Sequence, residues 1–325
     1  MNNQITHFWE FPVFQVIGGS TEKRTEWMHW LKGELAKRGL HAALVPPGAP
    51  VDLIELFHLI KCNDIVLMDT SGEFAVRTIF LTDGNKKADS ESTNLFFTAG
   101  AEQHFILELV QSLNDLVKSR PVWACILIGG KSSRMGRPKH LIEDSGGQTW
   151  LEHTVATLRP LVDGLVFSGA GAVPQTVVDV QRLPDIPGIA GPLTGILAAM
   201  RWQSGVSWLL LACDMPLLSR EAVDWLLQGR QAGQWGQVPR VKGKRYCEPL
   251  FAWYDIYAAQ LFEELVLHGN LRPGSVARHE KVNNPEIPKS LQSAWENVNT
   301  PEQLHVVEKG SAADLLGIIK KNVSF

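Results

Sequence analysis

The stretch LIGGKSSRMGRPKHLI, residues 127–142, decides how the fold is interpreted. The apolar run PVWACILI leads into it and predicts a buried strand. At Gly129 and Gly130 the strand ends in residues without a side chain, so the backbone can turn sharply and present consecutive N–H groups to an anion. Arg134 and Lys139 add a planar guanidinium fork and a compact ammonium charge. The stretch therefore predicts a phosphate-binding loop at the end of a strand.

On both sides of this loop, short apolar runs alternate with segments of helical period. That alternation is typical of βα units on a mainly parallel sheet. It occurs in two series, one before and one after a break near residue 119. The first series predicts strands at 12–19, 41–45, 64–69, 77–82 and 94–98, and helices at 25–38, 51–61 and 102–117. The second predicts strands at 124–130, 164–169, 177–185, 207–214 and 245–254, and helices at 149–159, 192–202, 219–229, 255–267 and 301–309.

The length of 325 residues predicts two domains, since one domain usually holds about 150 residues. Pro121 cannot continue the helix before it, and the strand pattern restarts there. We therefore expect domains at 1–118 and 119–309, each a three-layer α/β domain, followed by a tail helix at 310–325.

Composition excludes several classes of protein. A net charge of -3 provides no basic surface for nucleic acid. The four cysteines form no CxxC pair and the ten histidines form no HExxH motif, so neither predicts a zinc site. No apolar run approaches the roughly 18 residues that a membrane span needs, and the start lacks the order of a signal peptide. We expect a cytoplasmic protein with no membrane or nucleic-acid partner.

Two carboxylates complete the predicted phosphate site. Asp214 follows the buried run SWLLLAC, and the carboxyl ends of strands in an open α/β sheet face the ligand crevice. Asp185 precedes PGIAGP, where Gly191 and Pro192 open a helix. Carboxylates beside phosphates suit Mg²⁺. The alternatives are a helix cap at Asp214 and a turn residue at Asp185.

The loop, together with LPDIPGIAGPLTGI (183–196), LLLACDMPLL (209–218), CEPLFAWY (247–254) and ENVNTPEQL (296–304), resembles the molybdenum cofactor guanylyltransferase family, MobA. The resemblance covers 122–308. It implies a Rossmann-like nucleotidyltransferase fold for the second domain. The double glycine differs from the Ala-Gly that related cytidylyl- and uridylyltransferases usually carry.

The resemblance also implies roles for individual residues. The backbone of Leu127, Ile128, Gly129 and Gly130 would bind the nucleotide and read its base, and Lys139 and Arg134 would neutralise phosphate charge. Asp214 and Asp185 would hold Mg²⁺, with Asp185 binding guanine nucleotide as the other reading. Ser168 stands where several relatives carry Asn. The remaining predicted contacts are Gly191 and Pro192 on the nucleotide, where tight packing of the loop on the helix explains the glycine nearly as well. Asn297, Asn299, Arg272 and Arg278 are predicted on the acceptor, with solvated surface an equal alternative for the two arginines.

The implied reaction is transfer of GMP from GTP to (Mo-)molybdopterin, which releases pyrophosphate. A CTP-dependent cytidylyltransferase stays open because of Ser168, as does a protein that binds nucleotide or cofactor without transferring it. The resemblance leaves open a homo-oligomer and transient contact with molybdoenzymes or cofactor-insertion proteins.

The first domain carries VIGGSTEKRTEW (16–27), laid out as strand, loop and helix in the manner of a P-loop, GxxxxGK[ST]. Counted from Gly18, the second glycine is replaced by Lys23 and the lysine by Arg24, and only Thr25 fits. A working NTPase is therefore not expected. With NDIVLMDTSGE downstream, in which Asp69 stands where relatives have Glu, residues 12–118 resemble the companion protein MobB. This implies a P-loop-NTPase-like fold with a degenerate loop; an unrelated α/β domain with a glycine-rich turn is the alternative.

Overall fold

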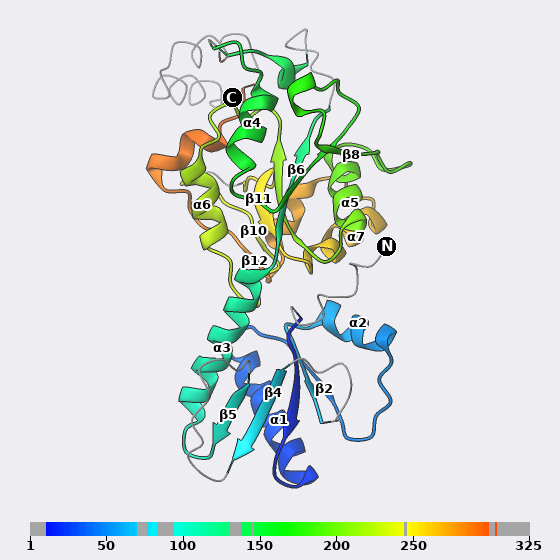
Figure 1. Cartoon of the computed structure of the whole chain (residues 1–325), viewed down its shortest axis with the longest axis vertical. Helices are drawn as coiled ribbons and strands as arrows, with labels where there is room; N and C mark the ends of the chain where they lie inside the picture. The colour runs from blue at the N-terminus through cyan, green and yellow to red at the C-terminus, as the bar shows by residue number, and fades with distance from the viewer. Residues whose placement is uncertain are drawn as a thin grey trace. The chain divides into compact units, whose positions relative to one another are not determined.

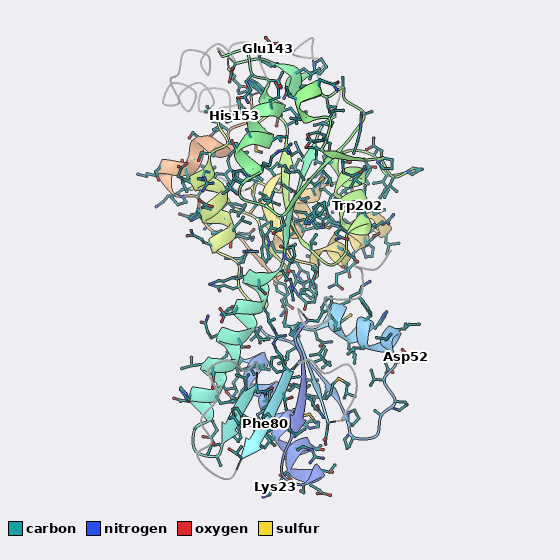
Figure 2. All side chains as sticks on the ribbon, viewed as in Figure 1. Lys23, Asp52, Phe80, Glu143, His153 and Trp202 are labelled. Atoms are coloured by element: carbon teal, nitrogen blue, oxygen red, sulfur yellow. The ribbon has the colours of Figure 1, made fainter. Side chains whose placement is uncertain are left out.

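The computed structural model describes residues 11–69, 77–82, 94–129, 138–144, 146–243, 246–298 and 303. The chain forms two compact units (Figure 1), and Figure 2 draws the described side chains on the same ribbon. Unit 1 comprises residues 1–120 with 230–233, and unit 2 comprises residues 121–229 with 234–325. In the described ranges no helix is both long and apolar enough to cross a membrane. The predicted tail helix at 310–325 and the helix at 301–309, apart from residue 303, lie outside the described residues.

Unit 1 contains a five-stranded sheet in the order β2-β3-β1-β4-β5, with every neighbouring pair parallel. The first described strand, β1, lies at the centre of this sheet. The later strands β2 and β3 lie on one side of it, and β4 and β5 lie on the other. The strands are β1 (Val13–Ile17), β2 (Ala42–Val45), β3 (Ile65–Met68), β4 (Arg77–Thr82) and β5 (Leu95–Thr98). The helices are α1 (Thr21–Ala36), α2 (Leu53–Cys62) and α3 (Glu102–Ser119).

Successive side chains along a strand point to opposite faces of the sheet, so the core of unit 1 lies on both faces. Phe14 on β1 faces α1 and α3, where it packs with Leu31 and Leu109. Val13, one residue earlier, faces α2 and packs with Leu56. Unit 1 is thus a three-layer α/β unit with helices on both faces. Residues 230–233 complete it on the α3 side, since the Ala232 N–H donates to Asn114 Oδ1 at 2.9 Å and Ala232 packs on the same core.

The turn between β1 and α1 is short. Gly18 and Gly19 both adopt positive φ, +96° and +66°, and a Cβ at Gly18 would lie 2.3 Å from the Leu81 carbonyl oxygen. Ser20 then caps the helix by accepting a hydrogen bond from the Lys23 N–H at 3.3 Å. The helix predicted from residue 25 therefore begins at Thr21. The positions that a P-loop would wrap around a phosphate are already in a helical turn.

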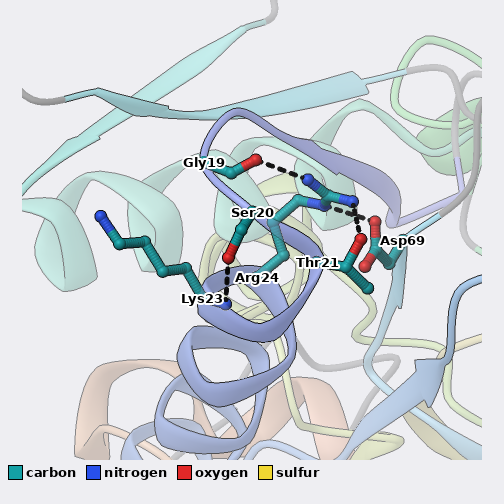
Figure 3. A network of polar contacts seen from close by, with 6 residues as sticks. All are labelled: Gly19, Ser20, Thr21, Lys23, Arg24 and Asp69. Atoms are coloured by element: carbon teal, nitrogen blue, oxygen red, sulfur yellow. Dashed lines mark hydrogen bonds and ion pairs between the residues drawn. The ribbon is translucent and has the colours of Figure 1, made fainter.

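Arg24 reaches back from this turn to the end of β3 (Figure 3). Its Nε donates to Asp69 Oδ1 at 2.5 Å, and its terminal nitrogens donate to the Gly19 carbonyl at 2.9 Å and to Thr21 Oγ1 at 3.1 Å. The Asp69 side chain is 4% exposed. Figure 3 shows the guanidinium lying over the glycine turn while Lys23 points away from it. The residue in the place of the P-loop lysine is thus held by the protein's own acceptors.

Unit 2 contains a seven-stranded sheet in the order β12-β10-β11-β9-β6-β7-β8. The four strands β9, β6, β7 and β8 run parallel, whereas β11 runs antiparallel to both β9 and β10. The predicted mainly parallel sheet is confirmed. The strands are β6 (Val122–Leu127), β7 (Gly164–Ser168), β8 (Gln181–Leu183), β9 (Ser207–Ala212), β10 (Gly236–Gln237), β11 (Phe251–Tyr254) and β12 (Val282–Asn283).

The helices of unit 2 lie close to their predicted ranges. They are α4 (Trp150–Leu158), α5 (Pro192–Trp202), α6 (Arg220–Gln228) and α7 (Ala258–Leu267). Side chains of α5 and α7, with Leu193, Ile196 and Phe262 fully buried, pack on one face of the sheet beneath Cys125 and Leu210. This core fixes the start of α5 beside the strand ends described below.

Two strand predictions in unit 2 were too long. Of the strand predicted at 177–185, only β8 forms, and a 3₁₀ turn occupies Gln175–Val177. Val177 and Val180 are both buried and three residues apart, a spacing that departs from the two-residue alternation of a strand. The strand predicted at 245–254 begins only at Phe251, after Pro249, which has no N–H for a ladder.

Candidate active site

The strands β6, β7 and β9 end side by side at one edge of the unit 2 sheet. Leu127, the last residue of β6, lies opposite Ser168 on one side and Ala212 on the other. The chain runs outward from β6 through β7 to β8 and then returns to the far side of β6 as β9. This reversal makes the edge a topological switch point, where open α/β sheets bind ligands.

A pocket of about 830 Å³ lies at this edge. Its lining brings together predicted site residues that are far apart in the sequence. They are Leu127, Gly129, Lys139, Ser168, Asp185, Gly191, Pro192 and Asp214. Of the others, Ile128 and Asn297 are described and adjoin the site, whereas Gly130, Arg134 and Asn299 lie outside the described residues. Arg272 and Arg278 flank and end a 3₁₀ turn, Pro273–Arg278, and neither is in the pocket lining.

Lys139 and Asp214 form an ion pair inside this pocket. The Lys139 ammonium donates to Asp214 Oδ2 at 2.9 Å, and the two side chains are 15% and 19% exposed. The second carboxylate oxygen, Oδ1, is buried and has no hydrogen-bond partner among the described residues. A buried carboxylate oxygen without a donor favours a ligand that brings positive charge.

Asp214 is held in place by its backbone neighbours. It follows β9 by two residues, and its carbonyl accepts a hydrogen bond from the Val298 N–H at 3.0 Å. That bond brings Asn297, whose buried Oδ1 has no described partner, next to the strand end. Burial raises the pKa of the preceding Cys213 thiol to about 12, and the Asp214 charge adds to the rise. The alternative of a helix cap is excluded, because Ser219 caps α6 by accepting from the Ala222 N–H at 3.3 Å.

Ser168 presents a second unpaired polar atom to the pocket. The residue is 2% exposed, and its buried hydroxyl has no hydrogen-bond partner among the described residues. Its backbone carbonyl accepts from the Ile128 N–H at 2.8 Å. Gly195 on α5 gives the side chain room, since a Cβ there would lie 2.6 Å from the hydroxyl oxygen. The hydroxyl is therefore free to bind a group that enters the pocket.

Asp185 lies on the loop that enters α5 and is exposed. The loop is fixed by Thr194, whose hydroxyl accepts from the Ile186 N–H at 2.6 Å. Gly191 precedes the helix with φ +75°, and Pro192 is its first residue. Asp185 thus faces the pocket beside the positive N-terminal end of a helix.

The sequence reasoning missed the loop after β7, which forms a further wall. Gly169 and Gly171 line the pocket, and so does His140, which follows Lys139. Burial lowers the pKa of His140. The signal that could have found this wall is the GAGA run directly after a predicted strand, a pattern in which glycine allows close backbone approach. No cluster of three or more His, Cys, Asp or Glu suited to a metal occurs among the residues that the structure describes.

Comparison with known proteins identifies the relatives of this unit. Residues 124–280 match the family model of the MobA-like NTP transferase domain. A molybdenum cofactor guanylyltransferase of Rhizobium meliloti is 35% identical over 198 residues, which are 57% of this chain and 89% of the relative. One of Nitrobacter hamburgensis is 29% identical over 204 residues, 60% of this chain and 96% of the relative.

A solved structure is also similar. Molybdopterin-guanine dinucleotide biosynthesis protein A from Archaeoglobus fulgidus is 25% identical, with a TM-score of 0.48, and the match covers 59% of this chain and 99% of that protein. The sequence matches extend over most of the relatives' length. By virtue of unit 2, the chain belongs to the molybdenum cofactor guanylyltransferase family of nucleotidyltransferases.

Proposed function

We propose that unit 2 transfers GMP from GTP to (Mo-)molybdopterin, giving the guanine dinucleotide cofactor and pyrophosphate. The observation that carries the proposal is the Lys139–Asp214 pair at the switch point, with one carboxylate oxygen buried and unpartnered in the pocket. Family membership supplies the substrates, since the relatives are molybdenum cofactor guanylyltransferases. A reaction between a nucleotide and a small cofactor precursor is consistent with a cytoplasmic enzyme that has no nucleic-acid or membrane partner.

The reaction needs positioning and charge neutralisation more than covalent catalysis. An oxygen of the terminal phosphate of molybdopterin attacks the α-phosphorus of GTP, and the bond from that phosphorus to the bridging oxygen of pyrophosphate breaks. The acceptor phosphate is already ionised, so no general base is required. Lys139 and Arg134 stabilise negative charge on the α-phosphoryl group and on the leaving pyrophosphate. The backbone of residues 127–130, with Gly191 and Pro192, binds the nucleotide.

The residues present fit Mg²⁺. Asp214 Oδ1 is a buried carboxylate oxygen with no described donor, and Asp185 lines the same pocket. Mg²⁺ is commonly held by one or two carboxylates together with substrate phosphates, so the absence of a larger acidic cluster among the described residues suits it. When bound, the ion supplies charge neutralisation at the phosphates. Lys139 occupies the other oxygen of Asp214 and leaves Oδ1 available.

The nucleotide base remains the main alternative within this proposal. Ser168 offers a hydroxyl that both donates and accepts, so it pairs with edge groups of guanine or of cytosine. A CTP-dependent cytidylyltransferase is therefore the second candidate, and its supporting observation is the unpartnered Ser168 hydroxyl. Asn297 and Asn299 are assigned to the acceptor side, and Asn297 precedes Val298, whose N–H donates to the Asp214 carbonyl.

The deciding experiment incubates the full-length protein with molybdopterin, Mg²⁺ and each of GTP, CTP, ATP and UTP. We expect pyrophosphate release with GTP and a product with the mass of the guanine dinucleotide. A cytosine dinucleotide would move the assignment to the CTP enzyme. Nucleotide binding without pyrophosphate release from any of the four would leave a binding protein and overturn the proposal.

For unit 1 we propose a MobB-like domain that no longer binds nucleotide and that serves docking, dimerisation or delivery of the pterin. The support is the Arg24 network, which fills the turn after β1 with the protein's own side chain. Titration of GTP and Mg²⁺ into the full chain should then show one binding site per chain. Two sites, the second surviving Lys139→Ala, would contradict the proposal.

A further inference from the structure

His140 sits on the turn that carries Lys139. Lys139 and His140 are the first two residues of the 3₁₀ turn Lys139–Leu141, and both line the pocket. The imidazole is buried, with the residue 4% exposed. Its Nε2 donates to the Ala172 carbonyl at 2.8 Å, since a carbonyl oxygen only accepts. The ring thus joins the Lys139 turn to the loop after β7.

Gly171 is fitted to this ring. A Cβ at residue 171 would lie 2.5 Å from the Cε1 of His140 and 2.7 Å from its Nε2. Gly171 is not among the glycines with positive φ, so its backbone conformation is open to any residue. The ring, rather than the backbone, therefore explains the glycine.

The other end of the same loop is held separately. Arg182 donates from Nε at 3.0 Å and from a terminal nitrogen at 2.7 Å to the Gly169 carbonyl. Gly169 itself packs on the backbone of Ile128, where a Cβ would lie 1.8 Å from the carbonyl oxygen. With His140 holding Ala172, both ends of the 169–172 loop are fixed, and the loop forms one wall of the pocket.

We propose that His140 is a positioning residue for the nucleotidyl transfer, because it joins the turn that carries Lys139 to the 169–172 wall and so fixes the ammonium group at Asp214. This inference rests on the proposed function. His140 acts through Lys139 and the 169–172 wall, and its hydrogen bond to the Ala172 carbonyl is the contact that positions them. Glutamine, whose amide N–H can donate to the same carbonyl, should replace it in part.

The test compares full-length His140→Ala, Gly171→Ala, the double variant and His140→Gln with the wild type. Pyrophosphate release gives kcat and KM for GTP, and thermal unfolding reports the folded fraction. We expect His140→Ala and Gly171→Ala each to lower kcat about tenfold while KM changes less than about threefold, because the lysine is misplaced at the reacting phosphate. The double variant should be no slower than either single one, since its alanine Cβ then meets no ring. His140→Gln should keep about half of the wild-type kcat.

The inference would be overturned if the loss in kcat of the double variant equalled the product of the two single losses. A kcat of His140→Ala within twofold of wild type would also overturn it. It would also be overturned if the rate losses only followed a loss of folded protein in the unfolding curves. A wild type that releases no pyrophosphate would instead remove the proposed function, and this inference with it. The wild-type measurement therefore separates the two failures.

Discussion

Each unit of this chain places a basic side chain against a carboxylate at the carboxyl end of a parallel strand. In unit 2 the pair is Lys139 and Asp214, 2.9 Å apart, and in unit 1 it is Arg24 and Asp69, 2.5 Å apart. In both units the cation and the acid follow two neighbouring parallel strands, β1 and β3 in unit 1 and β6 and β9 in unit 2. Both acids also keep one buried carboxylate oxygen without a described partner, and the two pairs differ in exposure and in the pocket beside them.

Arg24 donates three hydrogen bonds to protein acceptors, and the side chain of Asp69 is only 4% exposed. Lys139 meets Asp214 as a point charge in a pocket of about 830 Å³, and both side chains remain partly exposed. A guanidinium whose donors are taken up by its own chain stabilises a fold, whereas a compact ammonium charge that lines a pocket can contact a bound phosphate. The difference supports a structural role for the pair in unit 1 and the proposed catalytic role for the pair in unit 2.

The largest expected difference between the pairs is in turnover. Lys139→Ala should lower the rate of pyrophosphate release by about a thousandfold, because it removes the charge that stabilises the transferring phosphates. Arg24→Ala is the matched change in unit 1 and should leave the rate per folded molecule within about twofold of wild type. Steady-state assays of both variants, corrected for folded fraction by circular dichroism, make the comparison. An equal loss in the two variants would break it.

The next difference is in stability. Arg24→Ala leaves the buried Asp69 carboxylate without its cation and should cost about 2 to 3 kcal/mol of the free energy of unfolding. Arg24→Lys should recover part of that, since lysine restores the charge but not the fork. Urea unfolding followed by tryptophan fluorescence measures both, with Lys139→Ala as the control that changes little. An unchanged free energy of unfolding in Arg24→Ala would mean that the Arg24 network does not stabilise the fold.

The smallest effect concerns Ser168. Removal of an unpaired buried hydroxyl should leave the stability of the free protein unchanged or slightly raised, because no hydrogen bond is lost. In the proposed GTP enzyme the hydroxyl pairs with guanine, so Ser168→Ala should nevertheless narrow the ratio of kcat/KM for GTP over CTP by about fivefold, the value of one hydrogen bond to a base. Competition between the two nucleotides in one reaction measures that ratio. An unchanged ratio would remove Ser168 from base recognition.

The sequence predicted the parallel sheet of unit 2 and the gathering of most site residues, because hydrophobic periodicity and strand ends are local signals. Helix α5 was predicted with its observed bounds, Pro192–Trp202, since Gly191 and Pro192 mark a helix start unambiguously. The two-residue strands β10 and β12 carry too little pattern to be found. Arg134, the second predicted catalytic cation, lies outside the described residues, so its role stays a prediction.

Long-range side-chain contacts could not be predicted in the same way. The Arg24 contact with Asp69 spans 45 residues, and it exists because α1 begins four residues earlier than the apolar spacing indicated. The fit of His140 to Gly171 likewise depends on how two loops meet. Such contacts follow from tertiary packing, which residue spacing in one sequence does not encode.

The most direct test of the account replaces one oxygen in each carboxylate. Asp214→Asn and Asp69→Asn, both in the full-length protein, are assayed side by side with GTP, molybdopterin and Mg²⁺ for pyrophosphate release. We expect Asp214→Asn to be folded and inactive, and Asp69→Asn to turn over at the wild-type rate per folded molecule. Near-normal turnover of Asp214→Asn, or loss of turnover in a folded Asp69→Asn, would contradict it.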